Sequence, residues 1–329
     1  MANRSSDSYT TIQTATADDY LGPFGGRFFG SGYKRVRQDI SIGPMFAGSF
    51  AGELSLTMPD QWSTKGAARQ LPHASSIDII VAAALLGEHS ARLRKVEGPC
   101  WTEELTIRAP VAPEEGAAIN LAVSGESHVA GDDRTITTAD IGGFKAQITV
   151  AHHATNSEEI ANTESEANRP VTTAPHPYVD GFRHHINTVS NLEIDFDGNN
   201  ATSQLLTERD TENTAVVGVD ASPGVASVHL IDAFCEALQV GQILLYDLDN
   251  LQRATSNTLW MRRLRIRAQA PEFRVPNVKS VTDLQKLSLV AIQKETWRTA
   301  DIRYRRPGIE LTCSVAHKIA QGGGYDQIG

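Results

Sequence analysis

The sequence contains few cysteines: Cys100, Cys235 and Cys313 are the only three in 329 residues. An odd number of cysteines without paired CxxC spacing supports neither a disulfide framework nor a zinc ribbon. We therefore expect a protein of a reducing compartment, which places it in the cytoplasm.

An excess of basic residues and long apolar runs are also missing. The chain has 30 Lys and Arg against 39 Asp and Glu, a net charge of −9, which is a poor match to a phosphate backbone. No segment approaches the ~18 uninterrupted apolar residues of a membrane span. Residues 1–20 are polar and lack the apolar core of a signal peptide. We expect no nucleic acid partner and no membrane partner.

Motifs for nucleotides and metals are absent too. The glycines between Gly22 and Gly32 fit neither G-x-G-x-x-G nor the phosphate-binding P-loop. His152–His153 and His184–His185 are adjacent pairs, whose side chains diverge on a strand, and no H-E-x-x-H motif accompanies them. We predict no cofactor and no metal.

The two halves of the chain repeat the same short motifs in the same order. Thr138–Ile141 recurs letter for letter at Thr299–Ile302. Four looser matches agree in residue type, with offsets that rise in small steps along the chain: Gly32–Arg35 with Gly181–His184, Ser76–Asp78 with Leu230–Asp232, Trp101 with Trp260, and Ala151–His152 with Ala316–His317. Such a series is typical of two copies of one unit that differ by loop insertions.

Composition divides the chain around this repeat. Residues 154–177 are rich in Glu, Ser, Thr and Pro and have almost no large apolar side chains, which is typical of a linker. We therefore predict an N-terminal unit over 20–153 and a C-terminal unit over 178–320. Residues 1–19 and 321–329 are predicted to be flexible tails.

Each copy contains one strongly apolar helix, predicted over Ile77–Leu86 and over Val228–Tyr246. A helix that is apolar nearly all round is buried. Strand-like segments bounded by Gly and Pro follow each helix, at 105–107, 118–123 and 146–150 and at 264–268, 287–292 and 309–315. The predicted class is α+β: a double hotdog, in which two tandem antiparallel sheets each wrap a buried helix. Fused halves permit a monomer, and free edge strands leave a homodimer open.

Asp78 and Asp232 occupy equivalent places near the start of the two apolar helices. A carboxylate there costs several kcal/mol unless it is paired or neutralised. Ser75-x-x-Asp78 fits a capping box, whereas Ser227 lies too far before Asp232 for one. A buried salt bridge to a strand arginine is a second interpretation. The third is a catalytic acid or base facing an acyl-thioester tunnel, with its pKa raised by burial.

The approach to each helix resembles that of acyl dehydratases. Pro72–Asp78 resembles the His-Pro-x-x-x-Asp stretch that opens the hotdog helix of polyketide dehydratases, and His73 has the place of its histidine. Pro223–Gly224 resembles the helix entry of bacterial hydroxyacyl-carrier dehydratases. The H-x-x-x-G-x-x-x-x-P stretch of those enzymes is not found, which argues against plain dehydration. For His73, a hydrogen bond within the loop is the alternative to catalysis.

The N-terminal block resembles the bacterial avirulence protein D family. The similar segments are Asp19–Pro23, Arg27–Arg35, Gln61–Gly66 and Pro72–Asp78. The resemblance implies an enzyme of secondary metabolism that transfers a β-ketoacyl group from an acyl-CoA or acyl carrier protein thioester to a ketose or triose hydroxyl. Cyclisation of the ester to a butenolide, as in syringolide-type acyl glycosides, is implied as a further step.

Such a transfer needs a proton acceptor, donors for an oxyanion, and polar and aromatic contacts for a polyol. The chain offers these candidates: Asp78, Asp232 and His73 for catalysis, and Trp62, Lys65, Arg27 and Tyr33 for substrate binding. The basic segment 261–267 is best interpreted as a solvated strand face, with a docking edge for the carrier as the alternative. A thioesterase, a dehydratase and a non-catalytic acyl- or lactone-binding protein remain alternative functions.

Overall fold

The computed structural model describes residues 15–65, 68–94, 98–112, 114–152, 176–209, 217–222, 225–254, 256–292 and 294–319. Almost all of the predicted linker, the predicted C-terminal tail and Pro223–Gly224 lie outside these ranges. The first helix, α1 (Ala17–Leu21), begins inside the predicted N-terminal tail, and its Ala17 and Leu21 are buried. The folded part of the chain therefore starts before residue 20.

The first half contains one long helix and six long strands. In chain order, its elements are η1 (Phe24–Gly26), η2 (Gly32–Arg35), β1 (Arg37–Ile42), β2 (Ser49–Thr57), β3 (Thr64–Lys65), β4 (Ala68–Arg69), α2 (Ser76–Leu93), β5 (Cys100–Arg108), β6 (Ala118–Val129), β7 (Arg134–Ile141) and β8 (Phe144–His152).

The second half repeats this order without the short β3–β4 hairpin. Its elements are η4 (Gly181–His184), β9 (His185–Asp195), β10 (Asn200–Arg209), α3 (Leu230–Leu248), β11 (Trp260–Ala268), η5 (Pro271–Phe273), β12 (Lys279–Ile292), β13 (Glu295–Arg306) and β14 (Ile309–Lys318).

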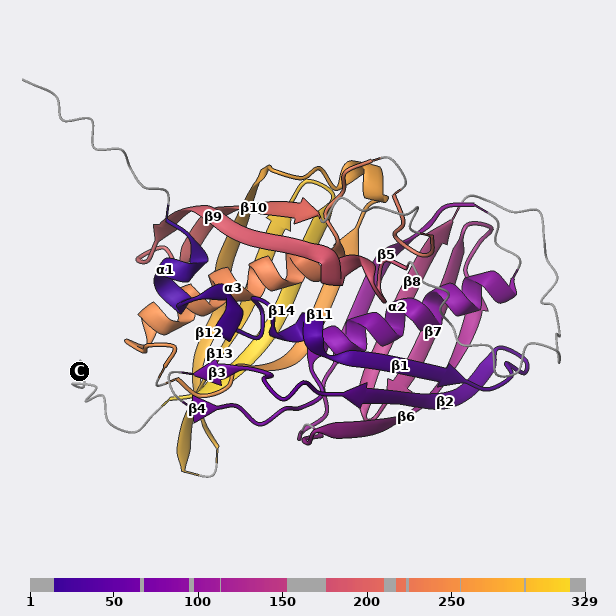
Figure 1. The fold of residues 1–329 in the computed structure, drawn as a ribbon, viewed down its shortest axis with the longest axis horizontal. Coiled ribbons are helices and arrows are strands. Elements are labelled where there is room, and N and C mark those ends of the chain that lie inside the picture. The colour runs from indigo at the N-terminus through magenta and orange to yellow at the C-terminus, as the bar shows by residue number, and fades with distance from the viewer. Residues whose placement is uncertain are drawn as a thin grey trace, which may run out of the picture.

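The twelve long strands form one antiparallel sheet, in the order β1-β2-β6-β7-β8-β5-β11-β14-β13-β12-β10-β9. The strand order is the same in both halves when each is followed from its first strand to the centre. The halves meet where β5 pairs with β11, for example Ile107 opposite Leu264. Figure 1 shows α3 and α2 in a row in front of the central strands. The α+β class and the large antiparallel sheet are thus observed.

The repeated motifs fall on equivalent elements of the two halves. Gly32–Arg35 and Gly181–His184 form η2 and η4. Thr138–Ile141 lies on β7, and Thr299–Ile302 lies on its counterpart β13. All six predicted strand segments lie within observed strands. Both helices extend beyond their predicted C-terminal ends, because α2 continues to Leu93 and α3 to Leu248.

A glycine in each long helix lets the helix approach the sheet closely. A Cβ at Gly87 would lie 2.9 Å from side-chain carbons of Ile148 and Val150 on β8. A Cβ at Gly241 would lie 2.5 Å from Ile302 on β13. The helices therefore pack with backbone almost against the sheet, and their apolar residues merge with the sheet into one core.

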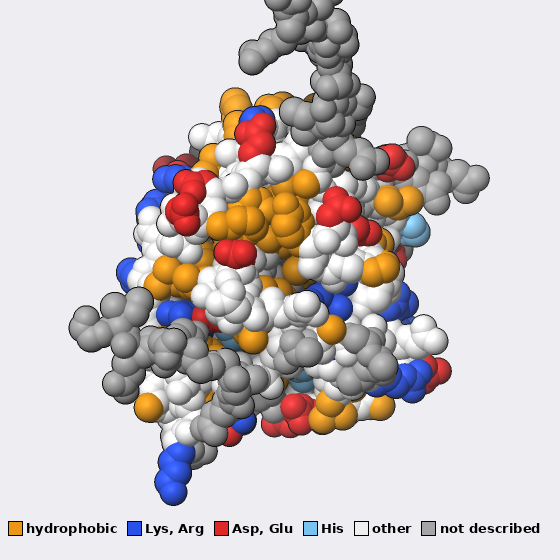
Figure 2. Space-filling view, turned by 90° about the vertical axis from the view of Figure 1, so that its left-hand side faces the viewer, with side chains coloured by type: hydrophobic (Ala, Val, Ile, Leu, Met, Phe, Trp, Pro, Cys, Tyr) orange, Lys and Arg blue, Asp and Glu red, His pale blue; other side chains and the backbone are white. Residues whose placement is uncertain are grey.

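The surface carries charges of both signs. On the face at the left of Figure 1, basic side chains are scattered among acidic ones rather than gathered in a stripe, as Figure 2 shows. On β11, Leu264 and Ile266 are buried whereas Arg265 and Arg267 are exposed and pair with Glu104. This alternation confirms the predicted solvated face. None of the described helices is long and apolar enough to cross a membrane.

Candidate functional site

A cavity of about 770 Å³ lies where the two halves meet. The first half contributes the N-terminal end of α2, including Ser75 and Ser76. The second half contributes the middle of α3, with Phe234 and Gln242, and the start of β11, with Trp260. The site therefore exists only because the two copies are joined side by side. Its volume is within the range of small-molecule sites.

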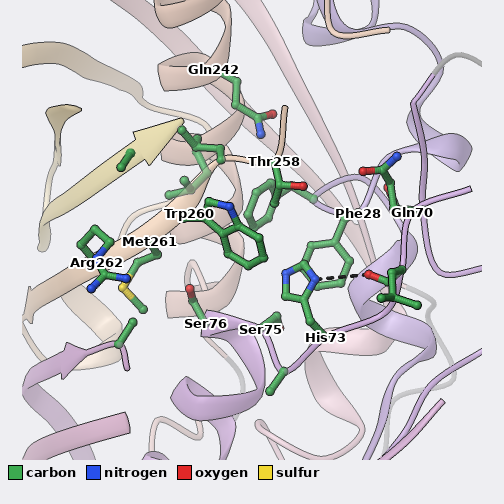
Figure 3. Close-up of a pocket in the computed structure, with 18 of the residues that line it drawn as sticks. Phe28, Gln70, His73, Ser75, Ser76, Gln242, Thr258, Trp260, Met261 and Arg262 are labelled. Carbon is green, nitrogen blue, oxygen red and sulfur yellow. Dashed lines mark hydrogen bonds between the residues drawn. The ribbon is translucent and has the colours of Figure 1, made fainter. Parts of the chain in front are cut away.

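His73 lines this cavity. Its ring lies between Trp62, at a centroid distance of 4.6 Å, and Trp260, at 5.0 Å. Its Nδ1–H donates to the carbonyl of Leu71 at 3.3 Å, which leaves Nε2 as the lone-pair nitrogen. Figure 3 shows this hydrogen bond as a dashed line and Trp260 beside the ring. Burial lowers the pKa of His73, so the imidazole is neutral near pH 7 and can accept a proton.

The start of α2 is held by the predicted capping box. Asp78 Oδ2 accepts from the Ser75 amide at 2.8 Å and from its hydroxyl at 2.7 Å, while the Ser75 hydroxyl accepts from the Asp78 amide. Asp78 Oδ1 accepts from Gln38 at 2.6 Å. Helix geometry leaves the amides of Ser76 and Ile77 without a partner inside the helix. Of these two residues, Ser76 lines the cavity, so its amide and the positive end of the helix dipole lie at the cavity wall.

Asp78 itself does not line the cavity, although the sequence led us to expect that it faces an acyl tunnel. Its side chain is fully buried beneath the helix start. Burial raises its pKa, opposed by its hydrogen bonds with Gln38 and Ser75. The contacts of Asp78 with Ser75 are those of the capping box that the sequence predicted.

Asp232 is equally buried and also lies away from the cavity. Its Oδ2 lies 2.5 Å from His185 Nδ1, and its Oδ1 accepts from Asn187 at 2.6 Å. Burial alone would raise its pKa, but His185 lowers it below the usual value. The predicted ion pair thus has a histidine of β9 as its partner, not a strand arginine. The N-cap of α3 is His229, whose ring accepts from the Ile231 amide.

Three of the four predicted substrate-binding residues line the cavity. Trp62 and Arg27 are almost fully buried, and Lys65 is half-buried. Lys65 Nζ donates to Ser256 and to the Asn257 carbonyl, which ties the β3–β4 hairpin to the second half. Tyr33 does not line the cavity.

Tyr33 packs at the junction of the two halves. Its ring stacks on the equivalent Phe182 at 6.0 Å and 11°. The cation next to each ring binds the backbone of the other half. Lys34 donates to the His185 carbonyl, and Arg183 donates to the carbonyls of Lys34 and Val36. This block holds the halves together, so the predicted role of Tyr33 in substrate binding has no support in its position.

The repeat places a second set of residues near the start of α3 and the middle of α2. Tyr178 packs there against His229, the N-cap of α3, with ring centroids 4.6 Å apart, and its hydroxyl donates to Asp220 at 2.6 Å. Asp220 pairs with Arg274 at 2.7 Å, both side chains being 1% exposed. Among the described residues, this second set therefore carries a buried polar cluster.

His176 and Glu88 extend this buried cluster along α2. His176 Nε2 contacts the Glu88 carboxylate, which also accepts from the Val219 amide at 2.9 Å. By the repeat, Glu88 corresponds to Gln242, which lines the open cavity. Equivalent places in the two copies thus carry different side chains.

Sequence reasoning missed the contribution of the second half to the open cavity. Phe234, Leu238 and Gln242 were part of an apolar helix pattern that marks burial only. Trp260 carried a signal, since it repeats Trp101 at the start of an equivalent strand. Within the described ranges, no three His, Cys, Asp or Glu side chains cluster as metal ligands would.

Comparison with solved structures finds similar layouts at low sequence identity. A tesB protein of Mycobacterium avium subs paratuberculosis has 9% identity and a TM-score of 0.43, covering 85% of this chain and 96% of that one. A trans-AT PKS dehydratase domain from Brevibacillus brevis has 8% identity and a TM-score of 0.43, with the same coverage. A protein of unknown function with a hot dog fold from Alicyclobacillus acidocaldarius has 10% identity and a TM-score of 0.40, covering 86% and 96%.

No curated protein matches the chain significantly. Among protein families, the one described as Pseudomonas avirulence D protein (AvrD) matches residues 13–320. This range includes both halves of the sheet, the two long helices and every residue of the cavity, and it agrees with the resemblance found in the N-terminal block. The chain therefore belongs to the Pseudomonas avirulence D protein family.

Proposed function

We propose that the protein is an enzyme that transfers a β-ketoacyl group from a carrier thioester to the hydroxyl of a ketose or triose. The observation that carries the proposal is the open cavity, in which a neutral histidine, His73, lies beside the N-terminal end of α2. The repeated sheet and helix of the two halves are consistent with two tandem hotdogs, and proteins described as thioesterases and a polyketide synthase dehydratase domain are among the similar solved structures.

The apolar part of the cavity suits the acyl chain. Phe28, Phe234, Leu238 and Met261 line it from both halves. The amide of Ser76, which lines the cavity, would then face the thioester carbonyl, where it and the helix dipole stabilise negative charge. Removal of one such donor in an enzyme typically costs about 10²–10³ in turnover.

His73 supplies the proton transfers. Its Nε2 accepts the proton of the acceptor hydroxyl while the hydroxyl oxygen attacks the thioester carbon. The tetrahedral intermediate then collapses, the C–S bond breaks, and the thiolate takes the proton back from the imidazolium. The products are a β-ketoacyl ester and the free thiol, and His73 returns to its neutral state. The hydrogen bond from Nδ1 to the Leu71 carbonyl maintains the required tautomer.

The two aspartates act as positioning residues in this scheme. Asp78 holds the first turn of α2, so it fixes the direction of the amide donors. Asp232 anchors α3 to β9 through His185 and Asn187, and α3 forms the opposite wall. The later ring closure to a butenolide would use the same cavity, because the ester and its keto group remain next to His73.

The test is to incubate the purified protein with a β-ketoacyl thioester and candidate ketoses and to identify the products by mass spectrometry. A ketose-dependent ester is expected. We expect His73→Gln to reduce its formation by about 10²–10⁴-fold. His128→Gln, which changes an exposed histidine on β6, should leave it unchanged.

Other products would overturn the proposal in a specific way. Free β-keto acid formed regardless of the ketose would indicate a thioesterase, and an enoyl product from a β-hydroxyacyl thioester would indicate a dehydratase. An unchanged thioester that nevertheless binds would indicate a non-catalytic acyl-binding protein.

A further inference from the structure

Three cationic side chains gather at one end of the open cavity. Arg27, Lys65 and Arg253 all line it. Arg253 donates to the carbonyl of Gly26, next to Arg27, and Lys65 donates to the carbonyl of Ser256, close to Arg253 in the chain. Burial lowers the pKa of Arg27 and of Lys65, and the charge of Arg253 lowers both further. Like charges held together in a partly buried place are unfavourable unless an anion accompanies them.

Few carboxylates balance this cluster. Asp18 pairs with Arg27 through Nη2, and its own side chain is 49% exposed. Lys65 donates only to neutral oxygens, on Ser256 and Asn257. Arg253 donates to the Gly26 carbonyl at 3.5 Å. The imbalance contrasts with the net charge of −9 of the whole chain.

The unpaired polar atoms of the cavity wall are all donors. Among its described lining residues, the buried side-chain atoms without a hydrogen-bond partner are Nε and Nη1 of Arg27 and the indole Nε1 atoms of Trp62 and Trp297. Arg27 is only 4% exposed. Buried donors without acceptors are rare in proteins. A ligand that brings several acceptor oxygens would satisfy them together.

We propose that the Arg27–Lys65–Arg253 cluster binds a phosphate group of one of the two substrates. A phosphate offers several charged oxygens to guanidinium, ammonium and indole donors that approach from different sides. The group belongs either to a phosphorylated ketose or to the CoA or phosphopantetheine part of the thioester. The inference deepens the proposed transfer and rests on it for the identity of the two substrates.

Binding without turnover tests this site separately from the reaction. Calorimetry would compare dihydroxyacetone phosphate with dihydroxyacetone, and CoA with pantetheine. We expect at least tenfold tighter binding of the phosphorylated member of one pair, weakened by added salt. Preference in the first pair assigns the phosphate to the acceptor, and preference in the second assigns it to the donor. Equal affinities within both pairs would overturn the proposal.

Variants connect the preference to the cluster. Arg253→Gln should lose most of the phosphate preference, and Arg253→Lys should retain part of it. Arg108→Gln is the matched control, because Arg108 is exposed on β5 and does not line the cavity. An unchanged preference in Arg253→Gln with a wild-type melting temperature would refute the assignment. If phosphate-dependent binding is found but no ketose ester ever forms, the proposed transfer fails and the phosphate site stands.

Discussion

Replacing Asp220 by Asn should destabilise the protein strongly. The Asp220 carboxylate lies 2.7 Å from Arg274, accepts from the Thr102 amide at 3.0 Å and accepts from the Tyr178 hydroxyl at 2.6 Å. Burial alone would raise its pKa, but Arg274 and these donors lower it, so the group is ionised. The asparagine side chain would be nearly the same size but neutral. The Arg274 guanidinium would then be buried without a counter-charge, which costs about 3–5 kcal/mol of unfolding free energy.

Urea unfolding followed by circular dichroism measures this loss directly. The control is Glu193→Gln, which breaks an exposed pair with Lys279 and should cost little unfolding free energy because solvent screens the pair. The double variant Asp220→Asn with Arg274→Met should recover part of the loss, because it removes the unpaired charge. Ester formation per folded molecule should persist, since neither side chain lines the open cavity. A loss no greater than that of Glu193→Gln would refute the reasoning.

Three further outcomes are expected. Burial lowers the pKa of His73 below its ordinary 6.5. We therefore expect kcat/KM for the proposed transfer to rise with pH to a plateau, with a midpoint below 6.5. A higher midpoint would contradict the role of His73 as a base that is neutral near pH 7. Gly241→Val should lower the unfolding free energy by about 1–3 kcal/mol, because its Cβ would lie 2.5 Å from Ile302, and an unchanged melting temperature would show that α3 has room to move. Burial would raise the folded-state pKa of Asp232, but His185 lowers it below the unfolded pKa of about 4. The ionised carboxylate therefore stabilises the fold at a pH above about 4. This stabilisation is lost as the pH falls through the lower folded-state pKa. Asp232→Asn should therefore flatten the acid limb of an unfolding-midpoint series, and an unaltered limb would exclude the pair as its cause.

The fold was largely predictable because it is repeated. Every motif match fell on an equivalent element, since a duplicated unit places the same apolar and turn residues at the same points of its sheet and helix. Helix lengths were underestimated at the C-terminal ends. Glu88 interrupts the apolar pattern after Leu86, yet it is buried by contacts with His176 and Val219 from a distant part of the chain.

The candidate site was predictable only in part. His73, Trp62, Lys65 and Arg27 line the cavity as expected of site residues, because they lie near the start of a helix whose position the capping box determines. Asp78 and Asp232 were expected at the cavity, but neither lines it. A sequence pattern shows that a carboxylate lies near the start of a helix. It does not show on which side of the helix the hydrogen-bond partners of that carboxylate lie.

The amino-acid sequence by itself determined the class of the fold, its duplication, the two buried helices and the cap at Ser75 and Asp78, because these depend on local periodicity and short-range hydrogen bonds. The tertiary structure decided where the open cavity lies and which side chains line it. Tyr178, Asp220 and Arg274 come from separate parts of the chain and meet only in the folded protein. They form a buried cluster near the start of α3, whereas the middle of the same helix, with Phe234 and Gln242, lines the cavity that is available to a ligand.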